Sequence, residues 1–224
     1  MLRKLDRINL NRKQGKLIAG VAVIVAVAVL TAALLLMAIA PPGSEVVVVA
    51  KVNGEAITSG DVTKLRVKVY EFLREQMSEE EALEQLIAWA VLYQEAEQQG
   101  YALTMDEAEQ ELEARVTSSG RTMEDIKAEL AKKSSFSYKE YLQDFQRQLA
   151  INSYLDDAVQ VPEVTEEEAR AWYNDYMQQH PEAGNMTFEQ RELEIMAILK
   201  QEKRQEAITR FIEELKEKAD IEYS

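Results

Sequence analysis

The chain has 224 residues, a formal net charge of −14 at pH 7, no cysteine and a single histidine. Without cysteine there are no disulfides, thiolate metal ligands or cysteine nucleophiles, and one histidine cannot build a multi-histidine metal site. The acid excess repels nucleic acid, which excludes it as a partner. No glycine-rich phosphate loop or metal-ligand spacing occurs, so no cofactor is expected.

The N-terminus combines a basic segment at residues 1–16 with the uncharged apolar run Leu17–Ala40. At about 1.5 Å rise per residue the run spans roughly 36 Å as a helix, enough to cross a hydrocarbon core of about 30 Å. Basic flanks stay on the cytoplasmic side. The sequence therefore predicts a single-pass protein of the cell membrane, with a cytoplasmic N-terminus, a transmembrane helix at 17–40, a linker at 41–45 and an extracytoplasmic domain at 46–224.

A cleaved signal peptide is the alternative interpretation of this run. Ala38-Ile39-Ala40 resembles a cleavage site, but a signal peptide has an apolar region of about 7–15 residues, and this run is longer. Pro41 and Pro42 follow directly and fit processing poorly. The pattern favours an uncleaved anchor. A lipid anchor is not expected, because the chain has no cysteine to acylate.

The extracytoplasmic part opens and closes with short strands. The β-branched run Val46–Val52 is too short for a helix and predicts a buried strand. Asn53-Gly54 is a two-residue hairpin signal, because both central positions tolerate positive φ, and 55–57 is the expected return strand. Ile221–Tyr223 predicts a terminal strand that pairs with the first.

Between these strands, a Ser or Thr followed three residues later by Asp, Glu or Gln marks each expected helix start. The pairs are Thr58/Asp61, Ser78/Glu81, Thr104/Glu107, Thr122/Asp125, Ser137/Glu140, Thr165/Glu168 and Thr187/Gln190. The apolar spacing after each pair predicts helices at about 59–76, 79–99, 105–118, 123–132, 138–159, 166–179 and 188–219. Gly100 is the expected left-handed cap of the second helix.

The order of these segments resembles the N-terminal chaperone domain of the SurA family, the parvulin-type peptidyl-prolyl isomerase foldases that assist exported proteins. The resemblance covers about residues 46–224. It is carried by Val52-Asn53-Gly54-Glu55-Ala56-Ile57-Thr58, Leu86-Ile87 through Glu95-Ala96, Thr104–Ala108, Met123–Ile126, Ser137–Tyr141, Val164–Glu168, Thr187–Glu189, Lys203–Ala207 and Lys218–Glu222. The implied fold is mainly α, with a multi-helix domain and a small antiparallel sheet of N- and C-terminal strands after the transmembrane helix.

One departure from the family pattern matters for function. A parvulin domain normally separates the Thr-Glu-Glu-Glu helix from the closing helix, but here only Asn174–Met186 lie between them, too few residues for a domain. Parvulin sites also use paired histidines and often a cysteine, as the family pattern implies. We therefore expect a non-enzymatic chaperone module with a helical part at 46–164, a shortened connection at 165–186 and a closing helix and strand at 187–224.

The resemblance implies an ATP-independent holdase whose partners are unfolded or newly exported polypeptides, with the export channel and a second copy of the chain as further candidates. A holdase needs adaptable apolar surface framed by charge. Candidate peptide-binding residues are the aromatic and methionine side chains Tyr70, Phe72, Met77, Met123, Phe136, Tyr138, Tyr141, Phe145 and Trp172. For each of them, a place in the hydrophobic core is the competing interpretation.

Two other functions remain open at this stage. If the chain is a non-catalytic interaction or assembly subunit, the same surface would bind one fixed partner in the membrane or the export channel. Prolyl isomerase activity is the third hypothesis, and the missing parvulin segment disfavours it.

Overall fold

The computed structural model describes residues 47–132, 137–180 and 187–224. The predicted basic segment, transmembrane helix and linker, together with Val46, lie outside these residues. Among the helices that are described, none is long and apolar enough to cross a membrane. The described elements are β1 (Val48–Val52), β2 (Glu55–Thr58), α2 (Ser59–Leu73), α3 (Glu79–Gln98), α4 (Met105–Ser118), α5 (Met123–Leu130), α6 (Tyr138–Ala158), α7 (Glu166–Gln179), α8 (Phe188–Lys218) and β3 (Ile221–Tyr223).

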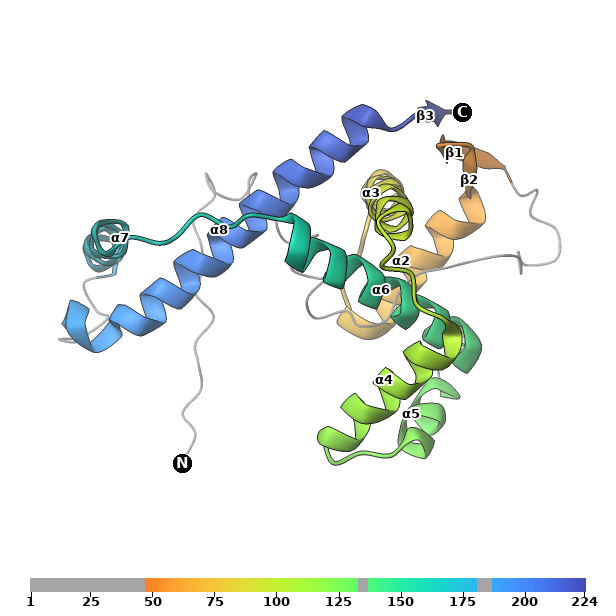
Figure 1. The fold of residues 1–224 in the computed structure, drawn as a ribbon, viewed down its shortest axis with the longest axis horizontal. Helices are drawn as coiled ribbons and strands as arrows, with labels where there is room; N and C mark the ends of the chain where they lie inside the picture. Colours follow the sequence, from red (N-terminus) through yellow and green to blue (C-terminus); the bar gives the residue numbers. More distant parts are fainter. Residues whose placement is uncertain (1–46, 133–136, 181–186) are drawn as a thin grey trace.

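The two ends of the described chain meet in one antiparallel sheet with strand order β2-β1-β3. Val52 lies opposite Ile221 and Ala50 opposite Tyr223, which confirms the predicted pairing of the N- and C-terminal strands. The alternation of β1 buries Ala50 and Val52 and turns Lys51 outward. The long helix α8 runs diagonally across the molecule and delivers β3 to the sheet (Figure 1).

The hairpin turn joins the sheet to its surroundings. Asn53 and Gly54 both have positive φ, as the predicted turn requires. The Asn53 backbone N–H donates to the Asp220 carbonyl at 2.7 Å, and the Asp220 N–H donates to the Asn53 side chain at 2.8 Å. Gln94 of α3 accepts a hydrogen bond from the Asn53 amide and donates one to the Val52 carbonyl. The turn therefore ties β1 to α3 and to the chain end at once.

Helix starts fall where the capping pairs predicted them. In the first six pairs the Ser or Thr hydroxyl accepts from the N3 backbone N–H, and the N3 carboxylate accepts in return from the N-cap backbone. At the seventh, the Gln190 side chain accepts from the Thr187 N–H at 3.0 Å. These bonds satisfy backbone donors that a helix leaves open at its first turn.

Helix ends differ more from the predictions. The helix α2, expected to reach Gln76, ends at Leu73 because Arg74 takes a left-handed conformation and its N–H donates to the Tyr70 carbonyl. The helix α5 ends two residues early, and α3, α6 and α8 end one residue early. Gly100 is left-handed after α3, as expected.

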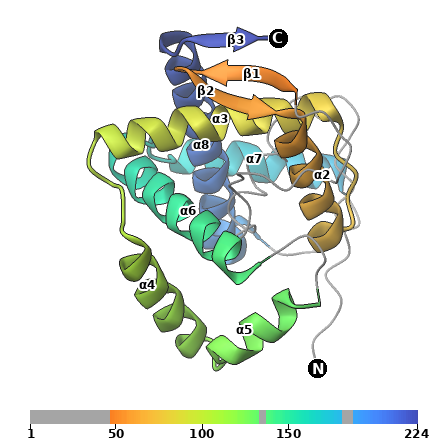
Figure 2. The same ribbon diagram turned by 90° about the vertical axis from the view of Figure 1, so that its right-hand side faces the viewer.

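Three apolar clusters hold the fold. The main core joins the sheet to α2, α3, the C-terminal half of α6 and the C-terminal half of α8. A second cluster forms between α4, α5 and the N-terminal half of α6. A small third cluster joins α7 to the first half of α8. Figure 2 shows α4 and α5 extending away from α3 and the sheet, while α6 belongs to both of the larger clusters.

Ile151 tests the main core, because its side chain is 1% exposed within α6. We expect Ile151→Ala to lower the free energy of unfolding by about 2–5 kcal/mol, through lost apolar burial and a residual cavity. Urea denaturation followed by circular dichroism measures this. Ser153, an exposed position on the same helix, provides the control, and Ser153→Ala should change stability by less than about 0.5 kcal/mol. Equal losses in the two variants would contradict the assignment of Ile151 to the core.

Candidate functional site: an exposed stripe on α2

The outward side of α2 carries an exposed stripe made of Thr63, Val67, Tyr70 and Arg74, which we call the outer stripe. Positions spaced by three or four residues lie on one side of a helix, so these four side chains are neighbours. Val67 is 40% exposed and Tyr70 51% exposed. The opposite side of α2 buries Val62, Leu65 and Val69, chiefly against α3. The stripe thus presents two exposed apolar side chains, Val67 and Tyr70, on a helix that is packed into the core.

Arg74 closes the outer stripe. Its left-handed backbone, with φ of 60°, is uncommon for a residue with a side chain. The Arg74 guanidinium lies 5.7 Å from the centre of the Tyr70 ring, within the range of a cation–π contact. A charged group therefore lies directly beside the exposed aromatic ring.

The predicted binding residues do not all share this surface. Phe72 is 37% exposed, but it lies about 200° around the helix from Tyr70. Met77 is half-buried against the main core. Val67, which belongs to the outer stripe, is not among the predicted residues, although its place away from the helical face of Val62, Leu65 and Val69 is a signal that the sequence contains.

Four more candidates belong to the cluster of α4, α5 and α6. Met123, Tyr138 and Tyr141 are half-buried at its edge. The Tyr138 hydroxyl donates a hydrogen bond to Glu109 at 2.8 Å. Burial raises the pKa of Tyr138, and this hydrogen bond raises it further. Phe145 is 2% exposed and packs inside the cluster, so its ring is not offered at the surface.

Trp172 lies at the other end of the molecule, half-buried on α7. Its ring stacks on Tyr176 with centroids 5.2 Å apart and planes 5° from parallel. One face of each ring is therefore covered by the other ring. Phe136 lies outside the described residues.

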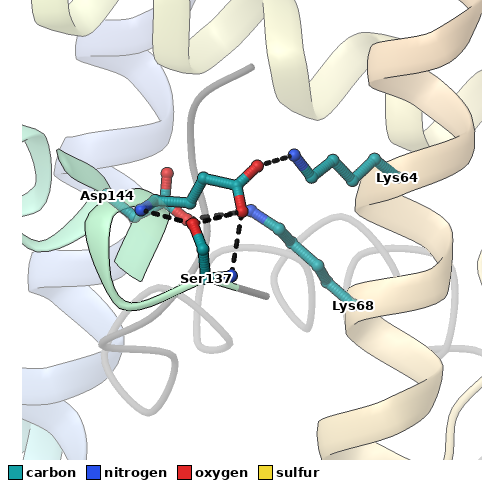
Figure 3. Close-up of polar contacts among 5 residues, drawn as sticks. Lys64, Lys68, Ser137 and Asp144 are labelled. Atoms are coloured by element: carbon teal, nitrogen blue, oxygen red, sulfur yellow. Dashed lines mark hydrogen bonds and ion pairs between the residues drawn. The ribbon is translucent and has the colours of Figure 1, made fainter. Parts of the chain in front are cut away.

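A pair of ionic contacts joins α2 to α6 (Figure 3). Lys68 and Asp144 form an ion pair of 2.8 Å whose side chains are 3% and 0% exposed. Lys64 pairs with Glu140 one helical turn away. We call these four residues the ionic ladder. The sequence contained one signal of it, since Lys68 interrupts the apolar face of α2, and a lysine on a buried face needs an anionic partner.

Burial and pairing act in opposite directions on these groups. Desolvation lowers the pKa of Lys68, and the charge and hydrogen bond of Asp144 offset this only in part. For Glu140, desolvation favours the neutral acid, but hydrogen bonds from Lys64 and from the backbone and hydroxyl of Ser137 outweigh it and lower the pKa to about 2. Glu140 therefore serves both as the capping carboxylate of α6 and as the partner of Lys64.

The Glu140 pKa generates a prediction about pH. A carboxylate whose folded-state pKa lies below its unfolded value of 4.5 stabilises the fold above pH 4.5, and this contribution is lost as pH falls towards 2. Because the side chain is 30% exposed, we expect Glu140→Gln to cost on the order of 1–3 kcal/mol at pH 6. Urea unfolding at pH 6, 4 and 2.5 should show the difference between wild type and variant shrinking. A difference that stays constant with pH would contradict the assigned ionic role.

Within the described residues, no group of three or more acidic, histidine or cysteine side chains is placed to hold a metal ion. The outer stripe offers two exposed apolar side chains, Val67 and Tyr70, next to the guanidinium of Arg74.

Comparison with known proteins identifies the family of the chain. The sequence model of the family described as the SurA-like N-terminal domain matches residues 5–155. No curated protein matches the chain significantly. Since the matched segment covers well over half of the chain and runs from before the sheet to near the end of α6, the chain belongs to the SurA-like N-terminal domain family.

Proposed function

We propose that the protein is a membrane-anchored, extracytoplasmic, ATP-independent holdase for unfolded or newly exported polypeptides. Membership of the SurA-like N-terminal domain family suggests a chaperone-related function. The observation that carries the proposal further is the outer stripe, where Val67 and Tyr70 remain exposed although they lie on a helix packed into the core.

The chemistry of the stripe suits weak and unselective binding. At about 25 cal/mol per Å² of apolar surface removed from water, two such side chains supply only a few kcal/mol, so each contact is short-lived. A tyrosine offers an apolar ring and a hydroxyl, and the neighbouring Arg74 can donate hydrogen bonds to a carboxylate or stack on a second ring. A client would thus be held by several shallow contacts in turn.

The remaining parts of the proposal rest on the sequence. The anchor is residues 17–40, the N-terminus is cytoplasmic, and the chaperone domain at 46–224 faces emerging chains. We propose binding without catalysis, because the shortened connection at 165–186 leaves no room for a parvulin domain. In a proline-peptide assay, isomerisation in the presence of the full chain should proceed at the uncatalysed rate.

The outer stripe makes the proposal testable by mutation. We expect the double variant Val67→Ser and Tyr70→Ser to suppress aggregation of a denatured client several-fold less well than wild type, because the apolar contacts are lost. Both positions are exposed, so stability should change by less than about 1 kcal/mol. The assay uses the full chain in lipid nanodiscs and follows client light scattering, with empty nanodiscs as the blank.

Leu193 provides the matched control. It is the most exposed large apolar side chain recorded for the described residues, at 87%, and it lies on the first half of α8, far from α2 (Figure 1). Leu193→Ser should leave aggregation suppression unchanged. No suppression by the wild type at several-fold molar excess would refute the holdase function, and equal effects of the two variants would refute the assignment to α2.

A further inference from the structure

The ionic ladder lies where the two larger apolar clusters come together. The helix α2 belongs to the main core and packs chiefly on α3, whereas the first half of α6 packs on α4. Across this junction the structure places two lysine–carboxylate pairs, Lys64–Glu140 and Lys68–Asp144 (Figure 3). A contact between two parts of one fold is usually apolar, and this one is ionic.

We call the state in which the ladder pairs are formed closed, and the state in which α2 and α6 have separated there open. A buried ion pair differs from an apolar contact in the free energy of the open state. Pairing in the closed state roughly balances the loss of hydration, so such a pair contributes little net stability. When the helices separate, the ammonium and carboxylate groups regain water. Lys68 and Asp144, which are 3% and 0% exposed, therefore favour the closed state only slightly. An apolar contact in the same place would resist separation much more strongly, because opening would expose it to water.

Opening would also change the apolar surface that α2 presents. Leu65 and Val69 lie beside Lys68 on the buried side of α2 and are 4% and 5% exposed. Separation of α2 from α6 would keep their packing on α3 but would let water and a client reach the edges of these side chains next to Lys68. The cap of α6 survives the loss of the Lys64 contact, because Glu140 also accepts hydrogen bonds from the Ser137 N–H at 2.9 Å and the Ser137 hydroxyl at 2.7 Å. Both helices can therefore stay intact while the distance between them changes.

We propose that the ionic ladder is a reversible latch between α2 and the first half of α6, and that its opening enlarges the apolar surface available to a client. The existence of the latch stands on the geometry of the ladder alone. Its link to clients rests on the proposed holdase function. The two claims fail separately, because opening is measured without a client.

The test measures the distance between the two helices. The chain contains no cysteine, so Glu75→Cys directly after α2 and Lys139→Cys on α6, both at exposed positions outside the outer stripe, place two spin labels without other changes. In the full chain in nanodiscs, pulsed electron paramagnetic resonance should show a short and a longer distance. Adding Lys68→Met with Asp144→Leu replaces the buried pair by apolar side chains. In this variant only the short distance should remain. A single, identical distance in both proteins would overturn the latch.

The control replaces an ion pair at the other end of α6. Arg204→Met with Asp156→Leu removes an exposed contact between α8 and α6, and both distances should persist. If the Lys68 and Asp144 variant does not fold, the labelled wild type decides alone, since one distance at every pH between 5 and 8 excludes an open state.

A client is added last. An excess of denatured client should shift the wild type towards the longer distance, and the apolar variant should suppress aggregation at least threefold less well. If the client's aggregation is suppressed but the proportions of the two distances do not change when it is added, the link between opening and binding is overturned. Two distances together with no suppression by wild type would leave the latch in place and refute the holdase function.

Discussion

The pairing of β1 with β3 is the constraint on which the rest of the structure depends. It brings residues from the start and the end of the described chain into one sheet, and the Asn53–Asp220 hydrogen bonds secure it from the side. Because β3 follows α8 directly, the pairing holds the C-terminal half of α8 over α3, where Ile208, Ile212 and Leu215 complete the main core. The helices between the two strands then pack within a closed unit, and α2 has a fixed inner side and a fixed outer side.

This closure determines which side of α2 is exposed, and so fixes the position of the outer stripe. A loose helix could turn Val67 and Tyr70 inward, but α2 is held on α3 by Val62, Leu65 and Val69, whatever the state of the ionic ladder. The exposed apolar side chains therefore cannot be satisfied within the described fold without disturbing it. Burial of the opposite side leaves this side of α2 available for a partner, as the proposed holdase function requires.

The sequence predicted the elements well because each rests on local chemistry. Capping pairs mark helix starts through hydrogen bonds between residues three apart, and Asn53-Gly54 specifies its turn through positive φ. Helix ends were harder, as at Leu73, because Arg74 adopts a left-handed conformation that sequence signals associate with glycine. The site was harder still. Phe145 and Tyr70 are both aromatic residues at helical spacing, and only the packing of α4 and α5 on α6 separates a core ring from an exposed one.

The most direct test of the central claim is site-specific photocrosslinking in cells from position 70, with position 193 as the control, followed by identification of the attached proteins. Tyr70 and Leu193 are both exposed and lie on different helices. We expect many unrelated exported proteins to be captured from position 70 and few from position 193. One recurrent partner at position 70 would contradict it, and would instead indicate a dedicated assembly subunit built on a chaperone fold.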